Sequence, residues 1–152
     1  MTNFTYGCLA GLSFNVATPA KILVVDSDPI FLLEAYEALC ERGFAVDVSS
    51  RGYEAFQLLR EDYYDLLILD WKLTDCTGDL ILEEILEDYN AISMRNRRVP
   101  MPVIIYADPE PASMRALLSC SKYFDFISVL PRAKRMENLS QNVAQTILAR
   151  EE

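Results

Sequence analysis

The stretch Asp65-Leu-Leu-Ile-Leu-Asp-Trp-Lys-Leu-Thr-Asp-Cys-Thr-Gly78 decides the fold of this chain. Its apolar run is typical of a buried strand, and the run ends in a carboxylate, Asp70. A second apolar run, Ile22–Val25, also ends in acid, at Asp26, with Asp28 just beyond. Because the carboxyl ends of parallel strands form the crevices in which ligands bind, the two strands predict an acidic pocket.

Strand-like and helix-like patterns alternate along the rest of the chain. Apolar runs predict strands at residues 21–26, 65–70, 99–107 and 126–130, and an alternating pattern predicts a fifth strand at 44–49. Amphipathic stretches predict helices that begin near Pro29, near Tyr53, after Gly78, around Met114 and before Leu139. Buried strands that alternate with amphipathic helices indicate the α/β class. We therefore expect a five-stranded parallel sheet, doubly wound as a flavodoxin-like (βα)5 three-layer sandwich.

Local signals mark the ends of the first two helices. Asp28 is a good N-cap, and Pro29 behind it is tolerated in a first helical turn. Gly43 is a plausible stop for that helix. Ser49 or Ser50 is expected to cap the second helix.

The composition is that of a soluble globular domain. The chain has 152 residues, 51% of them hydrophobic, and a net charge of −9. Since phosphate groups call for clustered Lys and Arg, this charge argues against nucleic acid and membrane surfaces as partners. The chain has no histidine, which excludes His-based triads and histidine metal sites within it. We expect residues 1–20 to form an N-terminal extension and residues 21–150 to form a single domain.

Four cysteines, Cys8, Cys40, Cys76 and Cys120, are widely scattered. They show no Cys-x-x-Cys spacing, so the sequence supports neither a disulfide framework nor a zinc site. We interpret them as reduced thiols and expect a cytoplasmic location.

Four segments lie in register along the strand pattern. They are Lys21-Ile-Leu-Val-Val-Asp-Ser-Asp-Pro29, the stretch 65–78, Val103-Ile-Ile-Tyr-Ala107 and Val129-Leu-Pro131. Together they resemble the receiver domains of two-component response regulators, the CheY-like family. The first resembles the opening strand and its acidic turn, the second the phosphoacceptor strand, and the last two the ends of the fourth and fifth strands. The resemblance covers residues 21 to about 150.

The resemblance implies a role in a phosphorelay, without an enzyme activity of the chain's own. Asp70 would be the phosphoacceptor. Asp26, Asp70 and the backbone carbonyl of Lys72 would hold Mg²⁺. The implied partners are a histidine kinase, a phosphotransfer protein or an output protein. In such domains catalysis is mostly positioning and charge neutralisation.

Three positions depart from the family's pattern. Ser27 stands where a second acid is expected, and it is a poorer Mg²⁺ ligand, so we expect weak metal binding. The fourth strand ends in Tyr106-Ala107, which offers no small hydroxyl. Leu130 replaces the lysine before the fifth-strand proline. Removing a comparable electrostatic partner from a dry site costs about 3–4 kcal/mol.

The crowded carboxylates need a cation in place of that lysine. Lys72, Arg132 or Lys134 could supply it, and the sequence leaves the three open. Tyr106 is expected to fill the volume between the pocket and the fifth strand, as a locked structural aromatic.

These observations favour a stand-alone, atypical receiver (a pseudo-receiver). It would signal through protein–protein contacts, with phosphorylation of Asp70 impaired or absent. The alternative is a functional phosphoacceptor in which a non-standard cation replaces the lysine. An unrelated flavodoxin-like nucleotide or flavin binder is disfavoured, because the strand-end loops are rich in Asp and would repel phosphate. The partner or homodimer face is expected on the fifth strand and last helix, with the residues Met136, Leu139, Val143 and Ile147.

Overall fold

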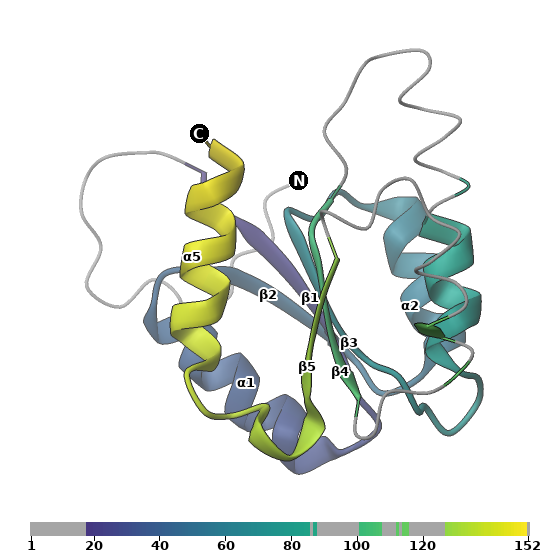
Figure 1. Ribbon diagram of the computed structural model, residues 1–152. Coiled ribbons are helices and arrows are strands. Elements are labelled where there is room, and N and C mark those ends of the chain that lie inside the picture. The colour runs from purple at the N-terminus through teal and green to yellow at the C-terminus, as the bar shows by residue number, and fades with distance from the viewer. Residues whose placement is uncertain are drawn as a thin grey trace.

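Five parallel strands form one sheet in the order β2-β1-β3-β4-β5 (Figure 1). They are β1 (Lys21–Val25), β2 (Ala45–Ser49), β3 (Leu66–Asp70), β4 (Val103–Ala107) and β5 (Ile127–Pro131). The structure is a computed structural model that describes residues 18–85, 87, 101–107, 112, 114–115 and 127–151. Some predictions lie outside these residues: residues 1–17 of the extension, the thiols of Cys8 and Cys120, the first residues of the strands predicted at 99–107 and 126–130, and most of the helix around Met114.

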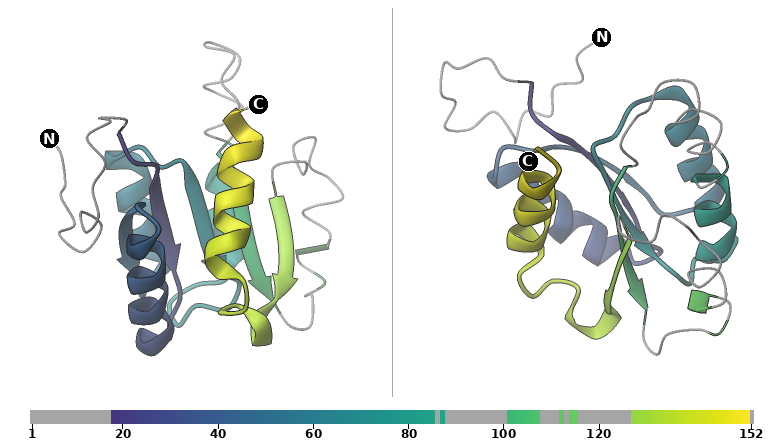
Figure 2. Two further views of the ribbon diagram at one scale, coloured as in Figure 1. Left: turned by 90° about the vertical axis from the view of Figure 1, so that its left-hand side faces the viewer. Right: turned by 45° about the horizontal axis from the view of Figure 1, so that its top comes forward.

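Helices cover both faces of the sheet, so the fold has three layers. α1 (Pro29–Glu41) and α5 (Leu139–Glu151) lie on one face. α2 (Gly52–Glu61) lies on the other face with the helical residues 78–85 (Figures 1 and 2). This arrangement confirms the predicted α/β class and the doubly wound parallel sheet. No helix within the described ranges is long and apolar enough to cross a membrane.

Burial on both faces explains why the central strands β1, β3 and β4 read as continuous apolar runs. Along β1, Ile22 and Val24 pack into the core beneath α1 and α5. Leu23 and Val25 pack into the core on the α2 side. Because successive side chains of a strand point to opposite faces, a strand in the middle layer needs an apolar residue at every position.

The ends of α1 agree with the sequence signals. Asp28 is the N-cap, and its Oδ1 accepts a hydrogen bond from the Ile30 N–H at 3.0 Å. Pro29 occupies the first turn. At the other end Gly43 has a φ of 91°, a left-handed conformation that glycine adopts without steric cost.

Three of the four residues predicted to form a partner face belong to the core. Leu139, Val143 and Ile147 are buried in the cluster beneath α1 and α5, whereas Met136, before the helix, is exposed. The prediction is therefore wrong for these three residues. Their apolar stripe covers the chain's own sheet, as the stripe of an amphipathic helix usually does.

The prediction of reduced thiols is wrong for Cys40, which is disulfide-bonded, whereas Cys76 is free. Sequence spacing alone does not show which thiols approach each other in a fold.

The N-terminus of α2 is capped from a distant loop. The carboxylate of Asp75 accepts hydrogen bonds from the N–H groups of Gly52 at 2.8 Å and Tyr53 at 3.1 Å. Burial tends to raise the pKa of Asp75, but these hydrogen bonds outweigh it and hold the pKa below its ordinary value. Neither expected serine caps the helix: the N-cap is Arg51, without a side-chain cap, and the Ser49 hydroxyl instead bonds the Arg51 backbone.

We predict that Asp75→Ala lowers the free energy of unfolding by about 1 kcal/mol, because two N–H groups at a helix terminus lose their acceptor. Asp75→Asn keeps one side-chain oxygen and should lose less. Urea unfolding followed by circular dichroism measures both. Glu34→Ala on exposed α1 surface is the matched control, and an equal loss in that variant would contradict the capping role.

Candidate functional site

Asp26 and Asp70 lie side by side because of the sheet's register. β1 and β3 are neighbours, and Val25 pairs with Leu69, so the next residue of each strand is an aspartate. The chain leaves these two central strands in opposite directions along the sheet, which makes their carboxyl ends the switch point where α/β sheets bind ligands. Both side chains are 1% exposed. The structure therefore brings the two predicted carboxylates together at one edge of the sheet, a site called the pocket below, and both are buried.

The surroundings of Asp26 favour its protonated form. Burial is the largest effect and, with the nearby charge of Asp70, raises the pKa of Asp26 to about 6. The Asp28 N–H, which donates to Asp26 Oδ1 at 2.9 Å, opposes this shift, as do the charges of Arg135 and Arg132. Two buried carboxylates at one strand edge thus require positive charge from elsewhere.

Arg132 supplies the first positive charge. Its Nε donates to Asp70 Oδ1 at 3.0 Å, and its Nη2 lies 4.0 Å from Asp26 Oδ1. Burial tends to lower the pKa of Arg132, but the hydrogen bond and charge of Asp70 outweigh it and raise the pKa above its ordinary value. Arg132 therefore stays charged and bridges the two strand ends.

Arg135 supplies the second positive charge. Its Nη2 donates to Asp28 Oδ2 at 2.8 Å, and its Nε lies 3.3 Å from Asp26 Oδ2 without hydrogen-bond geometry. The guanidinium carbon lies 4.6 Å from the centre of the Phe31 ring, a cation–π contact. Its side chain is only 14% exposed. Arg135 is therefore a largely buried cation with contacts to Asp26, Asp28 and Phe31.

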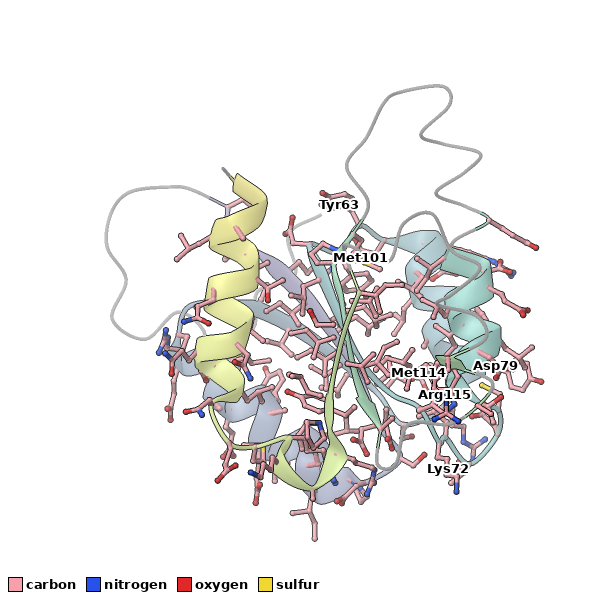
Figure 3. All side chains as sticks on the ribbon, in the orientation of Figure 1. Tyr63, Lys72, Asp79, Met101, Met114 and Arg115 are labelled. Atoms are coloured by element: carbon pink, nitrogen blue, oxygen red, sulfur yellow. The ribbon has the colours of Figure 1, made fainter. Side chains whose placement is uncertain are left out.

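A short helix explains why these two residues reach the pocket. After β5 the chain forms the 3₁₀ helix η3 (Arg132–Lys134), and the Arg135 N–H donates to the Arg132 carbonyl at 3.1 Å. Side chains three residues apart share one face of such a turn. Of the three candidate cations, Arg132 is therefore the one that contacts Asp70. Lys72 is exposed and points outward at the edge of the molecule (Figure 3), and no ion pair of Lys134 occurs in the described part of the chain.

Sequence reasoning missed Arg135 as a pocket residue. The signal was its spacing of three residues from Arg132 directly after a strand end, but that spacing points to a shared face only once a 3₁₀ turn is known.

The residues that depart from the family pattern make hydrogen-bond and packing contacts within the fold. The Ser27 hydroxyl accepts a hydrogen bond from the Thr74 N–H at 3.1 Å, which ties the two pocket loops together. Ala107 is buried, and the half-buried Leu130 packs against the core beneath α1 and α5. Leu130 pairs with Tyr106 across β4 and β5, so an apolar contact stands where the family has lysine.

Tyr106 lies next to Asp70 across β3 and β4. It is buried, and its ring packs edge-on against Phe31 with centroids 6.5 Å apart. Burial raises the pKa of its hydroxyl, an effect that the nearby Asn142 side chain and the charge of Arg135 oppose. Its hydroxyl makes no contact with hydrogen-bond geometry among the described residues.

The donor set fits Mg²⁺ poorly. No cluster of three or more His, Cys, Asp or Glu side chains that could hold a metal occurs among the described residues. Asp26 and Asp70 already contact guanidinium groups, and Ser27 is neutral. Asp70 Oδ2 is the pocket carboxylate oxygen that is buried without a described hydrogen-bond partner. Mg²⁺ demands near-ideal octahedral oxygen coordination, which this arrangement does not offer.

We predict that Asp26→Asn stabilises the protein above about pH 6 in EDTA, by on the order of 1–3 kcal/mol. Since folding raises the pKa of Asp26, its favourable contribution is complete below the unfolded-state pKa and is lost as the pH rises through about 6. The difference between wild type and variant should therefore vanish near about pH 4. Urea titrations across this range measure it, with Glu34→Gln as the exposed control. A pH-independent difference would contradict the assignment.

A comparison with family models matches residues 22–128 of this chain to the response regulator receiver domain. Two curated proteins are similar over parts of their length. The probable transcriptional regulator ycf29 of Porphyra purpurea is 33% identical over 65 residues, which are 43% of this chain and 31% of that protein. The hybrid signal transduction histidine kinase F of Dictyostelium discoideum is 26% identical over 69 residues, 45% of this chain and 6% of that protein. The matched region thus spans less than a third of either relative.

Solved structures share the fold. The signal receiver domain of an HD domain-containing protein from Pseudomonas fluorescens Pf-5 superposes with a TM-score of 0.69 at 19% identity, covering 88% of this chain and 98% of that chain. The sheet order, the paired strand-end aspartates and the family match agree. The chain therefore belongs to the response regulator receiver domains, the signalling domains of two-component systems.

Proposed function

We propose that this domain is an atypical receiver that signals through protein–protein contacts, with phosphorylation of Asp70 impaired or absent. The observation that carries the proposal is the contact between Arg132 Nε and Asp70 Oδ1 at 3.0 Å. A phosphoacceptor attacks through a carboxylate oxygen, and a guanidinium on that carboxylate lowers its electron density and blocks one approach. The family's lysine and small hydroxyl are also replaced, by Leu130 and by Tyr106-Ala107.

One observation favours the alternative, a working phosphoacceptor. Asp70 Oδ2 is buried and has no described hydrogen-bond partner, so no described donor competes with a phosphoryl group for this oxygen. Arg132 would then be the non-standard cation that stabilises the transferred phosphoryl group in place of the lysine. The two candidates differ in whether Arg132 blocks or assists the reaction.

A histidine kinase, a phosphotransfer protein or an output protein is the partner class we propose. The contact surface that we propose is β5, at the edge of the sheet, with the exposed face of α5 around Leu148, in place of the predicted face of Leu139, Val143 and Ile147. The same surface could instead bind a second copy of this chain and form a homodimer. An exposed edge strand can pair with a second chain unless it is covered.

We predict no mass gain of one phosphoryl group when the protein is incubated with acetyl phosphate and Mg²⁺ and its intact mass is measured. Beryllofluoride with Mg²⁺ should likewise leave the NMR spectrum almost unchanged. A receiver domain that carries the usual lysine is the positive control. A mass gain that disappears in Asp70→Asn would contradict the proposal.

Arg132→Gln separates the two candidates if phosphorylation is seen. Under the alternative, the variant should react about 100-fold more slowly, as when one stabilising donor is removed from a reaction site. Lys134→Gln is the matched control, because it removes a charge from the same short helix. A faster reaction in Arg132→Gln would show that Arg132 blocks Asp70.

A further inference from the structure

We propose that the guanidinium groups of Arg132 and Arg135 are the resident cations of this pocket, so that the domain does not take up Mg²⁺. This inference rests on the proposed function, because exclusion of Mg²⁺ would explain why Asp70 is not phosphorylated. Its test measures metal binding alone. The ligand class that the pocket excludes is a divalent cation.

Arg132 occupies the position that a shared cation would need. A cation shared by Asp26 and Asp70 must lie between their carboxylates, and the Arg132 head already lies there, with nitrogens 3.0 Å from Asp70 Oδ1 and 4.0 Å from Asp26 Oδ1. An incoming Mg²⁺ would meet like charge at close range. Solvent screens part of this repulsion, because the Arg132 side chain is 40% exposed.

Arg135 keeps a positive charge in the pocket even if Arg132 moves. Its head contacts Asp26 and Asp28, stacks on the Phe31 ring, and lies 3.4 Å from the Arg132 carbonyl, to which its Nη1 donates. A side chain that is held in place beforehand loses little conformational entropy when it pairs. Arg132 is 40% exposed and could swing away, but Arg135 is 14% exposed and would remain beside Asp26.

Few oxygen ligands remain for a metal. Asp26 Oδ1 accepts from the Asp28 N–H, and the Ser27 hydroxyl accepts from the Thr74 N–H. Asp70 Oδ2 is the one carboxylate oxygen of Asp26 and Asp70 without a described partner. Together with the Lys72 carbonyl that the family pattern implies, it gives two protein ligands beside two guanidinium groups, which disfavours Mg²⁺.

The test is a Mg²⁺ titration of the whole chain, followed by ¹H–¹⁵N NMR at constant ionic strength. The amides of Asp28, Trp71 and Lys72 adjoin the pocket, and Trp71, the single tryptophan, gives a second readout by fluorescence. Wild type should show no saturable change. Arg132→Met should show saturable binding at a Mg²⁺ concentration at least about tenfold below the highest one that leaves wild type unchanged, because Asp70 loses its counter-ion. Arg132→Met/Arg135→Met should bind more tightly still.

Lys134→Met is the matched control and should behave like wild type. Saturable Mg²⁺ binding to wild type at these amides would overturn the proposal, and this result needs no variant. A folded Arg132→Met/Arg135→Met that still shows no binding would also overturn it, because something other than the two arginines would then exclude the metal. If that variant does not fold, Arg132→Lys tests the same point: its shorter side chain should weaken the exclusion. Phosphorylation of Asp70 is measured separately, by intact mass. The proposed function and the exclusion of Mg²⁺ can therefore fail independently.

Discussion

The ion pair between Arg132 and Asp70 is the contact on which the rest of the pocket depends. The sheet order places the carboxyl ends of β1 and β3 together, and both strands end beside buried aspartates. Two neighbouring buried carboxylates are stable only if cations accompany them or a proton neutralises one of them. The end of β5 supplies the cation through Arg132. The loop after β5 therefore fixes the electrostatic state of a site built by two other strands.

Removing one partner of a buried ion pair typically costs about 3–5 kcal/mol, because the other charge is left unpaired. Arg132 is partly exposed, so solvent screening reduces this cost. Arg135 extends the network to α1, where Phe31 packs edge-on against Tyr106 of β4. Pocket charge and core packing are thus joined through one aromatic pair, which links Arg135, after β5, to α1 and β4.

Most of the fold could be predicted from the sequence, because strands buried on both faces must be apolar at every position. The pocket aspartates were predictable for the same reason: Asp26 and Asp70 end such strands. The identity of the cation was not predictable. It depends on the 3₁₀ turn after β5, which brings Arg132 and Arg135 to one side and leaves Lys134 out.

Two further errors have physical causes of the same kind. The cap of α2 comes from Asp75, 23 residues from Gly52, and a non-local cap leaves no local signal. The apolar stripe of α5 looked like a partner face, but Val143 and its neighbours fill the chain's own core. An apolar stripe indicates which face of a helix is buried. Only the tertiary structure shows whether that face packs against the chain's own core or against a partner.

A double-mutant cycle tests the central claim most directly. Urea unfolding in EDTA of wild type, Asp70→Asn, Arg132→Met and the double variant gives the coupling free energy between the two side chains. If Arg132 is the resident counter-ion of Asp70, the coupling should be favourable by about 1–3 kcal/mol. A coupling indistinguishable from zero would show that the two groups do not depend on each other, and it would contradict the account.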